Sequence, residues 1–303
     1  MTHLFISRKD KDKGENMNIT AQMVKELRDK TGAGMMDAKK ALVEVDGDME
    51  KAQEILRQKG IASADKKMGR IAAEGRVDSY VDANCGTMIE VNCETDFVAK
   101  NDEFKTLTAN LAKHVAQVTP ATVEEFLAAT CPDCGKTFED ALKEKIASIG
   151  EKITVRRFVR YEGNVATYIH NGKIGVLLNT DAKDEELMND ICLHIASNAP
   201  KFVSREEIPQ SVIDEETRIE MGKEDLLKKP ENIRAKIVEG RVNKIMAERC
   251  LLEQPFVKDP NQTVGQLIEG KLTIKAFTRY ELGEGLEKRQ DNFAEEVMAQ
   301  VKG

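Results

Sequence analysis

The first part of the chain spaces its apolar residues three or four positions apart, which is the pattern of short amphipathic helices. Residues 17–60 contain three such stretches, separated by residues that cap helices or form turns. The boundary residues are Thr20, the segment Thr31–Gly34, Asp48 and Gly60. We therefore expect a small three-helix bundle here, followed by a basic linker helix at residues 61–74.

Farther along, apolar and polar residues alternate with the two-residue period of strands, and this pattern occurs twice. Residues 79–96 (SYVDANCGTMIEVNCETD) and 167–181 (TYIHNGKIGVLLNTD) each predict two strands around a glycine-containing turn. In the second copy the turn is Asn171–Gly172, a pair that favours a tight hairpin. The chain is therefore predicted to contain an internal repeat of antiparallel hairpins.

A helix with an apolar stripe follows each hairpin. The stripe residues are Phe104, Leu107, Leu111 and Val115 in the first copy, and Leu187, Ile191, His194 and Ile195 in the second. Aligning LAKHVA with CLHIAS puts His114 and His194 at equivalent positions. The expected fold class is α+β, with a duplicated ββα core and antiparallel sheets.

The segments between and after the two copies are mostly helical by pattern. Residues 122–150 are predicted to form helices, and residues 152–161 a further strand. Residues 209–253 are charged and helical, with one interruption at Lys229–Asn232. Two long helices joined by a short turn predict a protruding antiparallel helical hairpin, a coiled coil.

The predicted domain division follows these elements. From the N-terminus it consists of a disordered leader (1–16), the three-helix module (17–60), the linker (61–74), the first core half (75–150), the second core half (151–204), the helical hairpin (205–253), a return to the second core half (254–285) and a C-terminal helix (286–303). The leader is almost entirely polar or charged after Ile6, which prevents packing, and Met17 could itself be a start.

The charge balance restricts the class of partner. Lys+Arg 46 against Asp+Glu 53 gives a net charge of −7, whereas nucleic-acid-binding proteins are usually basic. A nucleic-acid partner is therefore disfavoured, although a local patch such as Lys66–Arg76 leaves RNA contact open. No apolar run approaches the roughly 18 residues of a membrane span. With sparse cysteines and no export signal, we expect a cytoplasmic protein with reduced thiols.

Few residues suggest catalysis or cofactor binding. Cys131 and Cys134 have the spacing of half a zinc site, but no second pair accompanies them, so two free thiols are expected. No glycine-rich phosphate loop is present, so direct nucleotide binding is not expected. His114 and His194 lie on apolar faces and are expected to be hydrogen-bonded core residues. We expect no enzyme, no cofactor and no metal.

Five stretches of the sequence resemble the elongation factor Ts family of bacteria. They are TGAGMMDAKKAL (31–42), EVNCETDFVAKN (90–101), HNGKIGVL (170–177), EGR (239–241) and QPFVKDPNQTVGQL (254–267). The resemblance extends in the same order from Met17 to the C-terminus, and the CPDC loop departs from the family pattern. Members of this family are guanine-nucleotide exchange factors for elongation factor Tu.

The resemblance implies that a UBA-like three-helix module packs on the nucleotide domain of Tu. Its expected contact residues are Val24, Leu27, Gly32, Gly34, Met35 and Met36, and one of the two adjacent methionines is expected to face outward. His170 and Gly172 are expected contacts in the second core half. The partner is Tu in its GDP-bound and nucleotide-free forms, and a 2:2 assembly with Tu is open.

The resemblance also implies that one short segment displaces the Mg²⁺ of Tu. This segment consists of Thr95, Asp96, Phe97 and Val98, and Phe97 is expected to act as an apolar wedge. Without the resemblance, Phe97 also fits an ordinary core ring and Asp96 a helix cap. A second function class, an RNA- or ribosome-binding accessory protein, would use Lys66–Arg76 and the helical hairpin.

Overall fold

The computed structural model describes residues 19–227 and 229–287, and its chain divides into two compact units. The first unit contains the described residues up to Gly69 together with Glu139–Glu151, and the second contains the rest. The sequence places residues 139–150 in the first core half, whereas the structure groups them with the N-terminal helices. The predicted leader and nearly all of the predicted C-terminal helix lie outside the described residues.

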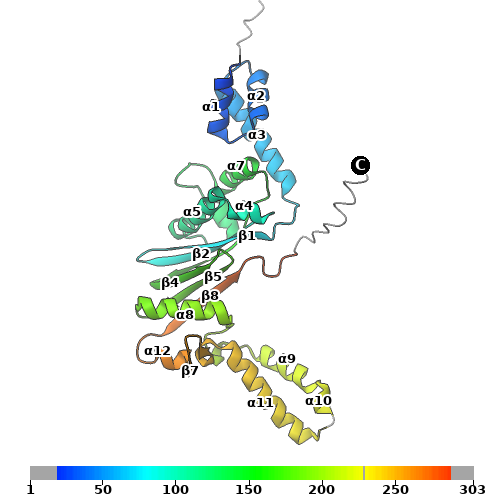
Figure 1. Ribbon diagram of the computed structural model, residues 1–303, viewed down its shortest axis with the longest axis vertical. Helices are drawn as coiled ribbons and strands as arrows, with labels where there is room; N and C mark the ends of the chain where they lie inside the picture. The colour runs from blue at the N-terminus through cyan, green and yellow to red at the C-terminus, as the bar shows by residue number, and fades with distance from the viewer. Residues whose placement is uncertain (1–18, 228, 288–303) are drawn as a thin grey trace, which may run out of the picture. The chain divides into compact units, whose positions relative to one another are not determined.

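Four helices build the first unit (Figure 1). They are α1 (Ala21–Thr31), α2 (Met35–Glu44), α3 (Met49–Lys67) and α7 (Phe138–Ile149), whose first residue belongs to the second unit. Leu27, Leu42 and Ala52 lie in one apolar cluster, so α1, α2 and α3 share a core. The predicted caps are confirmed, because the side chains of Thr20 and Asp48 accept hydrogen bonds from the first turns of α1 and α3.

The third helix does not end at Gly60, where the sequence predicts its end. Instead α3 continues to Lys67, and β1 (Glu74–Val81) begins soon afterwards, so the predicted linker helix is partly an extension of α3. A Cβ atom added to Gly60 would lie 3.0 Å from the Cβ of Ala147 in α7. The glycine therefore allows two helices to pack closely, and only the tertiary contact distinguishes this role from a helix stop.

The second unit is built around two three-stranded antiparallel sheets (Figure 1). One has the order β1-β2-β3, with β2 at Cys85–Cys93 and β3 at Thr154–Glu162. The other has the order β4-β5-β8, with strands at Asn164–His170, Ile174–Thr180 and Ile274–Glu281. The sheets face each other, α5 (Asp102–Val118) covers the first, and α8 (Glu185–Asn198) covers the second. This confirms the expected α+β class and the duplicated core.

Glycines in the two central strands allow the sheets to approach closely. A Cβ on Gly86 would lie 2.4 Å from a methyl carbon of Val165, and one on Gly175 would lie 2.4 Å from a methyl carbon of Val77. Each glycine pairs with a tyrosine of the third strand, Gly86 with Tyr161 and Gly175 with Tyr280. The first glycine is therefore a strand residue and not part of the predicted turn, whereas the Asn171–Gly172 turn is confirmed by positive φ at both positions.

The repeat extends to a third strand in each copy, which the hairpin pattern alone did not reveal. Residues 152–162 (KITVRRFVRYE) and 271–281 (KLTIKAFTRYE) share Lys, Thr, Phe, Arg, Tyr and Glu at the same positions. The pairing irregularity also repeats, between Glu90 and Val91 in β2 and between Asn179 and Thr180 in β5. The duplicated element is therefore a ββαβ unit, and each copy carries an insertion between its helix and its last strand.

The two insertions differ in size and form. The first contains α6 (Val123–Ala128) and α7, and the same copy has one further short helix, α4 (Asp96–Lys100), ahead of α5. The second contains the predicted helical hairpin, formed by α9 (Gln210–Met221), the short α10 (Glu224–Leu227) and α11 (Glu231–Arg249). Its own apolar cluster includes Ile208, Leu226 and Val242. The strands β6 (Pro255–Phe256) and β7 (Asp259–Thr263) and the helix α12 (Val264–Ile268) then lead to β8.

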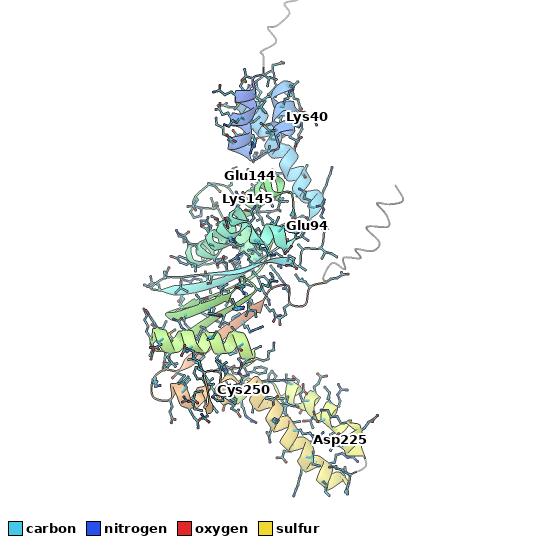
Figure 2. The ribbon with its side chains drawn as sticks, in the orientation of Figure 1. Lys40, Glu94, Glu144, Lys145, Asp225 and Cys250 are labelled. Atoms are coloured by element: carbon cyan, nitrogen blue, oxygen red, sulfur yellow. The ribbon has the colours of Figure 1, made fainter. Side chains whose placement is uncertain are left out.

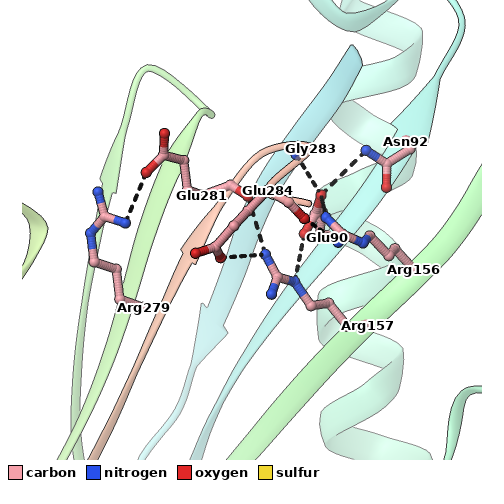
Figure 3. A network of polar contacts seen from close by, with 8 residues as sticks. All are labelled: Glu90, Asn92, Arg156, Arg157, Arg279, Glu281, Gly283 and Glu284. Atoms are coloured by element: carbon pink, nitrogen blue, oxygen red, sulfur yellow. Dashed lines mark hydrogen bonds and ion pairs between the residues drawn. The ribbon is translucent and has the colours of Figure 1, made fainter. Parts of the chain in front are cut away.

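A buried carboxylate ties the two halves of the core together (Figure 3). Glu90 of β2 has no exposed surface, and its oxygens accept hydrogen bonds from Arg156 Nη1 at 2.9 Å and Arg157 Nε at 2.6 Å. The backbone N–H of Gly283, just after β8, donates to the same carboxylate at 2.8 Å. Arg157 also stacks over the Tyr280 ring at 4.1 Å. A buried charge with this many donors fixes the end of β8 against the first sheet.

The two equivalent histidines are hydrogen-bonded core residues, as the sequence predicts. His194 is fully buried, its Nε2 lies 2.8 Å from Gln254 Oε1, and the N–H of Val257 donates to its Nδ1. His114 Nε2 lies 2.9 Å from Asp133 Oδ2. Within the described residues, no helix is both long and apolar enough for a bilayer crossing.

Candidate partner-binding site

The segment predicted to act on Tu follows the most enclosed strand of the molecule. Every residue of β2 is buried, so the chain leaves the sheet at a fixed position after Cys93. Thr95 then caps α4, and its side-chain oxygen accepts a hydrogen bond from Val98 N at 3.3 Å. The alternative that Asp96 caps the helix is wrong, because Asp96 is its first residue. The short helix is therefore held at its N-terminus by Thr95.

Phe97 projects into solvent from the first turn of α4. Its exposed fraction is 80%, the largest among the exposed large apolar side chains of the described residues. Ala99 of the same helix is buried and Val98 is half-buried, so α4 rests on the core with one face and presents the ring on the other. The alternative that Phe97 is a core ring is therefore wrong.

Charged neighbours flank the exposed ring. Asp96 and Lys100 form an ion pair at 2.6 Å along one face of α4. The hydrogen bond from Lys100 lowers the pKa of Asp96, and the same bond raises the pKa of Lys100. Both side chains are substantially exposed, so the pair contributes little to stability. It does keep a carboxylate beside the ring at neutral pH.

The base of this segment is anchored by Glu94, which sequence reasoning missed. Its side chain, labelled in Figure 2, accepts a hydrogen bond from the backbone N–H of Lys152 at 2.6 Å and pairs with Arg70 at 3.2 Å. These contacts join the end of β2 to the start of β3 and to the chain before β1. The only signal in the sequence was an acidic residue between the end of the strand and Thr95, the residue that caps the next helix. The strand end from which α4 starts is therefore fixed by hydrogen bonds.

The first unit exposes apolar residues on α2. Met35 and Met36 are 51% and 65% exposed. Both therefore face outward, whereas the sequence predicts that one of them does. Val43, on the same helix, is 56% exposed. The exposed residues Met35, Met36, Lys40 and Val43 are called the α2 surface below, and Lys40 is labelled in Figure 2. Gly32 and Gly34 are also exposed, and Gly32 ends α1 with φ +67°.

Two of the predicted contact residues in the first unit are buried, and their role as contacts stays a prediction. Leu27 has no exposed surface, and Val24 has only 8%. Both lie on the inner face of α1, where they pack against α2 and α3. An apolar stripe on a helix in a small bundle is used for the bundle's own core first, and the sequence alone could not separate this use from partner binding.

In the second core half, His170 is exposed to solvent, whereas Gly172 is buried. His170 is exposed at the end of β4, where Tyr168 Oη lies 3.1 Å from its Nδ1 and Asn171 Nδ2 lies 3.3 Å from its Nε2. These neighbours hold the ring in one orientation. Gly172 is buried, and its carbonyl accepts a hydrogen bond from Val77 N at 2.7 Å. Gly172 thus joins the two sheets, and its role as a contact residue stays a prediction.

Metal and RNA chemistry receive little support from the described residues. Within that part of the chain, no group of three or more His, Cys, Asp or Glu side chains could hold a metal ion. The basic stretch Lys66–Arg76 is partly neutralised, since Arg70 pairs with Glu94 and Arg76 lies 3.8 Å from Asp78. Such pairing reduces the positive potential available to a phosphate backbone.

Comparisons with known proteins point to one family. Residues 94–284 match the family model described as Elongation factor TS. The chain is also 47% identical over 293 residues to Elongation factor Ts of Alkalilimnicola ehrlichii. That alignment covers 95% of this chain and 100% of the relative.

Proposed function

The chain belongs to the elongation factor Ts family, and on that premise we propose that it is a guanine-nucleotide exchange factor for elongation factor Tu. It binds Tu that carries GDP, disturbs the Mg²⁺ and phosphate site of Tu, and promotes release of GDP so that GTP can bind. The chain forms and breaks no covalent bond in this cycle. It acts in the cytoplasm as a binding partner and not as an enzyme.

One observation carries this proposal, namely the exposed ring of Phe97 on a rigidly anchored helix. Phe97 is 80% exposed, and its helix follows a fully buried strand and is capped by Thr95. A soluble chain gains stability by burying such a ring, so leaving it in water is unfavourable for the isolated protein. The arrangement makes physical sense if the ring is buried in a complex.

The energetic role of the ring follows from linkage. Mg²⁺ and a phosphate loop hold the nucleotide on Tu by charge. Phe97 binds in a form of Tu in which those contacts are broken, and its burial contributes about 1.5–3 kcal/mol to that form. Because coupling is reciprocal, the factor weakens nucleotide binding as much as nucleotide weakens binding of the factor. A thousandfold effect requires about 4 kcal/mol, so further contacts must contribute.

The α2 surface supplies part of the remaining free energy in this proposal. Methionine side chains are flexible and adapt to irregular surfaces, and two adjacent ones here are more than half exposed. His170, held by Tyr168 and Asn171, adds a polar contact from the second core half. Affinity is thus distributed over separate surfaces, and the α4 segment provides the step that opens the nucleotide site.

The test is release of a fluorescent GDP analogue from purified Tu. We expect the full chain to accelerate release strongly at excess unlabelled GDP, without any RNA present. The control is the chain heated until unfolded, which removes the α4 segment's fixed position. Release at the spontaneous rate with the folded chain, together with salt-sensitive RNA binding, would instead support the accessory RNA-binding function.

A further inference from the structure

The loop between α6 and α7 carries two cysteines in the run CPDCG, and the exchange function does not use them. The loop is closed at its base like a small hairpin. Thr130 and Thr137 form an antiparallel bridge, the N–H of Cys131 donates to the carbonyl of Lys136 at 2.7 Å, and the N–H of Phe138 donates to Ala129. The two cysteines therefore lie inside a closed ring of backbone hydrogen bonds.

Within this loop the residues from Cys131 to Cys134 form a tight turn. The carbonyl of Cys131 accepts hydrogen bonds from the N–H groups of Cys134 at 3.4 Å and of Gly135 at 3.0 Å. Residues at the first and last positions of a β-turn have Cα atoms less than about 7 Å apart, and disulfides span about 4.4–6.8 Å. The turn thus brings the two cysteines to the separation that a disulfide needs.

Contacts on both sides hold the turn in place. Asp133, in the middle of the turn, lies 2.9 Å from the Nε2 atom of the mostly buried His114. At the base, the ring of Phe138 stacks on Phe126 with centroids 4.4 Å apart and contacts His114 at 5.1 Å. The turn is therefore fixed to the core from its tip and from its base, which limits the conformations that separate the two sulfurs.

The accessibility of the six cysteines, all of which lie in the described part of the chain, separates this pair from the others. Cys134 is exposed, and the other five are buried. Cys85 and Cys93 lie at the two ends of β2, roughly 26 Å apart at about 3.3 Å per residue, and cannot pair. Cys192 and Cys250 belong to different apolar clusters. An oxidant in solution therefore reaches Cys134 first.

We propose that Cys131 and Cys134 form a redox-active dithiol that closes an intrachain disulfide when it meets a peroxide or a small-molecule disulfide. Cys134 is the residue that attacks the oxidant, because it is exposed, and the buried Cys131 is the resolving residue. Burial raises the pKa of the Cys131 thiol, and its hydrogen bond with Cys134 adds to the effect, which disfavours its thiolate.

The chemistry balances with hydrogen peroxide as the oxidant. The Cys134 sulfur attacks one peroxide oxygen, the O–O bond breaks, and hydroxide leaves and takes up the thiol proton as water. The Cys131 sulfur then attacks the Cys134 sulfur, the S–O bond breaks, and the second hydroxide leaves with the Cys131 proton. The dithiol loses two electrons and two protons in total, and one peroxide becomes two waters.

The experiment uses the full chain, reduced and freed of reductant under nitrogen, then exposed to hydrogen peroxide or oxidised glutathione. Remaining thiols are trapped with a maleimide after denaturation, and the intact mass and the peptides are measured. We expect one new disulfide, between Cys131 and Cys134, and four trapped thiols. Cys134→Ser should form none, and Cys85→Ser, the matched control, should still form it.

Two further variants test whether the fold sets up the pair. Cys131→Ser leaves Cys134 without its resolving thiol, so its mixed disulfide with glutathione should accumulate at least about tenfold above the wild-type level. Asp133→Ala should slow ring closure severalfold, because it removes the bond to His114, whereas Asp133→Asn should restore it. The Asp133 side chain is 77% exposed, so both substitutions should leave the fold intact.

Three results would overturn the proposal. One is that Cys131 and Cys134 both remain trapped as free thiols after long incubation with oxidised glutathione. Another is a disulfide that joins two chains through Cys134. The last is a zinc ion bound by the thiols of the purified chain, which would make the loop a metal site. None of these readouts depends on nucleotide exchange.

Discussion

In both copies of the ββαβ unit, a carboxylate just after the central strand accepts a hydrogen bond from the backbone at the start of the third strand. Glu94 accepts from Lys152 N at 2.6 Å, and Asp181 accepts from Thr273 N at 2.6 Å. The hydrogen bonds from Thr273 lower the pKa of Asp181. The copies also share the glycine–tyrosine pairs and the position of the strand irregularity. They are therefore two versions of one scaffold.

The copies differ immediately after that carboxylate. In the first, the chain forms α4 with the exposed Phe97 before α5 begins. In the second, Asp184 caps α8 directly, with no helix between. The second copy instead carries the helical hairpin before its last strand. The comparison shows that the shared scaffold provides fixed end points, whereas the added segments expose apolar side chains such as Phe97 and Ile219.

The central strands also differ at one buried position. Glu90 and Asn179 occupy equivalent places beside the strand irregularity, but Glu90 receives two arginines, whereas Asn179 donates to the carbonyl of Glu162 at 2.7 Å. Replacing Glu90 by alanine leaves two partly buried guanidinium groups without their carboxylate. We expect a loss of about 3–5 kcal/mol in the free energy of unfolding, measured by denaturant titration.

The equivalent change in the second copy provides the control. Asn179→Ala removes neutral hydrogen bonds and should cost about 1–3 kcal/mol. Equal losses in the free energy of unfolding would mean that the charged network of the first copy stabilises the fold no more than the neutral hydrogen bonds of the second.

The next largest effect is expected for the α2 surface, which lies in the first unit and not in the duplicated core. Replacing Met35 and Met36 together by aspartate puts two charges on the α2 surface, where a partner would have to desolvate them. We expect binding to Tu to weaken about a hundredfold or more, with the circular dichroism spectrum unchanged. The matched control is Ile219→Asp with Ile233→Asp on the hairpin, also exposed apolar residues. Normal Tu binding by the folded methionine variant would show that the α2 surface contacts something else.

Phe97→Ala tests the segment that only the first copy has. The ring is exposed, so its removal should leave the melting temperature nearly unchanged. Binding to nucleotide-free Tu should fall about ten- to a hundredfold, from about 1.5–3 kcal/mol of lost burial, and GDP release should slow. Adding Asp96→Ala should give less than the sum of the single effects, because the two residues share one site.

A loss of several kcal/mol in stability, with exchange at the normal rate in the folded fraction, would contradict this role. Ile219→Ala, which removes an exposed apolar side chain from the hairpin, serves as the control and should leave exchange unchanged.

The buried histidine of the second copy predicts a pH dependence. Burial lowers the pKa of His194 below its ordinary value of 6.5, and the hydrogen bond with Gln254 only partly opposes this. The unfolded chain therefore takes up a proton as the pH falls through about 6.5, while the folded chain does not. Stability should decline below that pH, by at most about 1.4 kcal/mol per pH unit from this group.

The measurement is denaturant unfolding at a series of pH values between neutral and mildly acidic. His194→Gln should reduce the slope in this range, even if it lowers stability at every pH. An unchanged slope in the variant would assign the pH dependence to other groups.

The smallest effect is expected for the loop cysteines, which the second copy lacks. Cys131→Ser with Cys134→Ser should change the free energy of unfolding by less than about 1 kcal/mol under reducing conditions. GDP release should continue at the wild-type rate, because neither thiol belongs to the α4 segment or the α2 surface. A severalfold loss of exchange in the reduced variant would show that the first insertion contributes to the function.

Local spacing in the sequence was sufficient for much of the fold. It predicted the helices of the first unit with their caps, the two hairpins, the equivalent histidines and the helical hairpin, because periodicity and capping depend on near neighbours in the chain. It also singled out Thr95–Val98 through the resemblance to a family. The third strand of each copy was readable as a repeat, but its place in the sheet was not.

Only the tertiary structure decided which apolar and polar residues face inward. Phe97 and Leu27 are both apolar residues on helices, yet one is 80% exposed and the other has no exposed surface. The same holds for Gly60, which fits against Ala147, and for Gly172, whose carbonyl holds the opposite sheet. Glu90 is fully buried, and Arg156 and Arg157 of another strand neutralise it there. Exposure depends on segments distant in sequence that cover a residue, and the pattern around that residue contains no record of them.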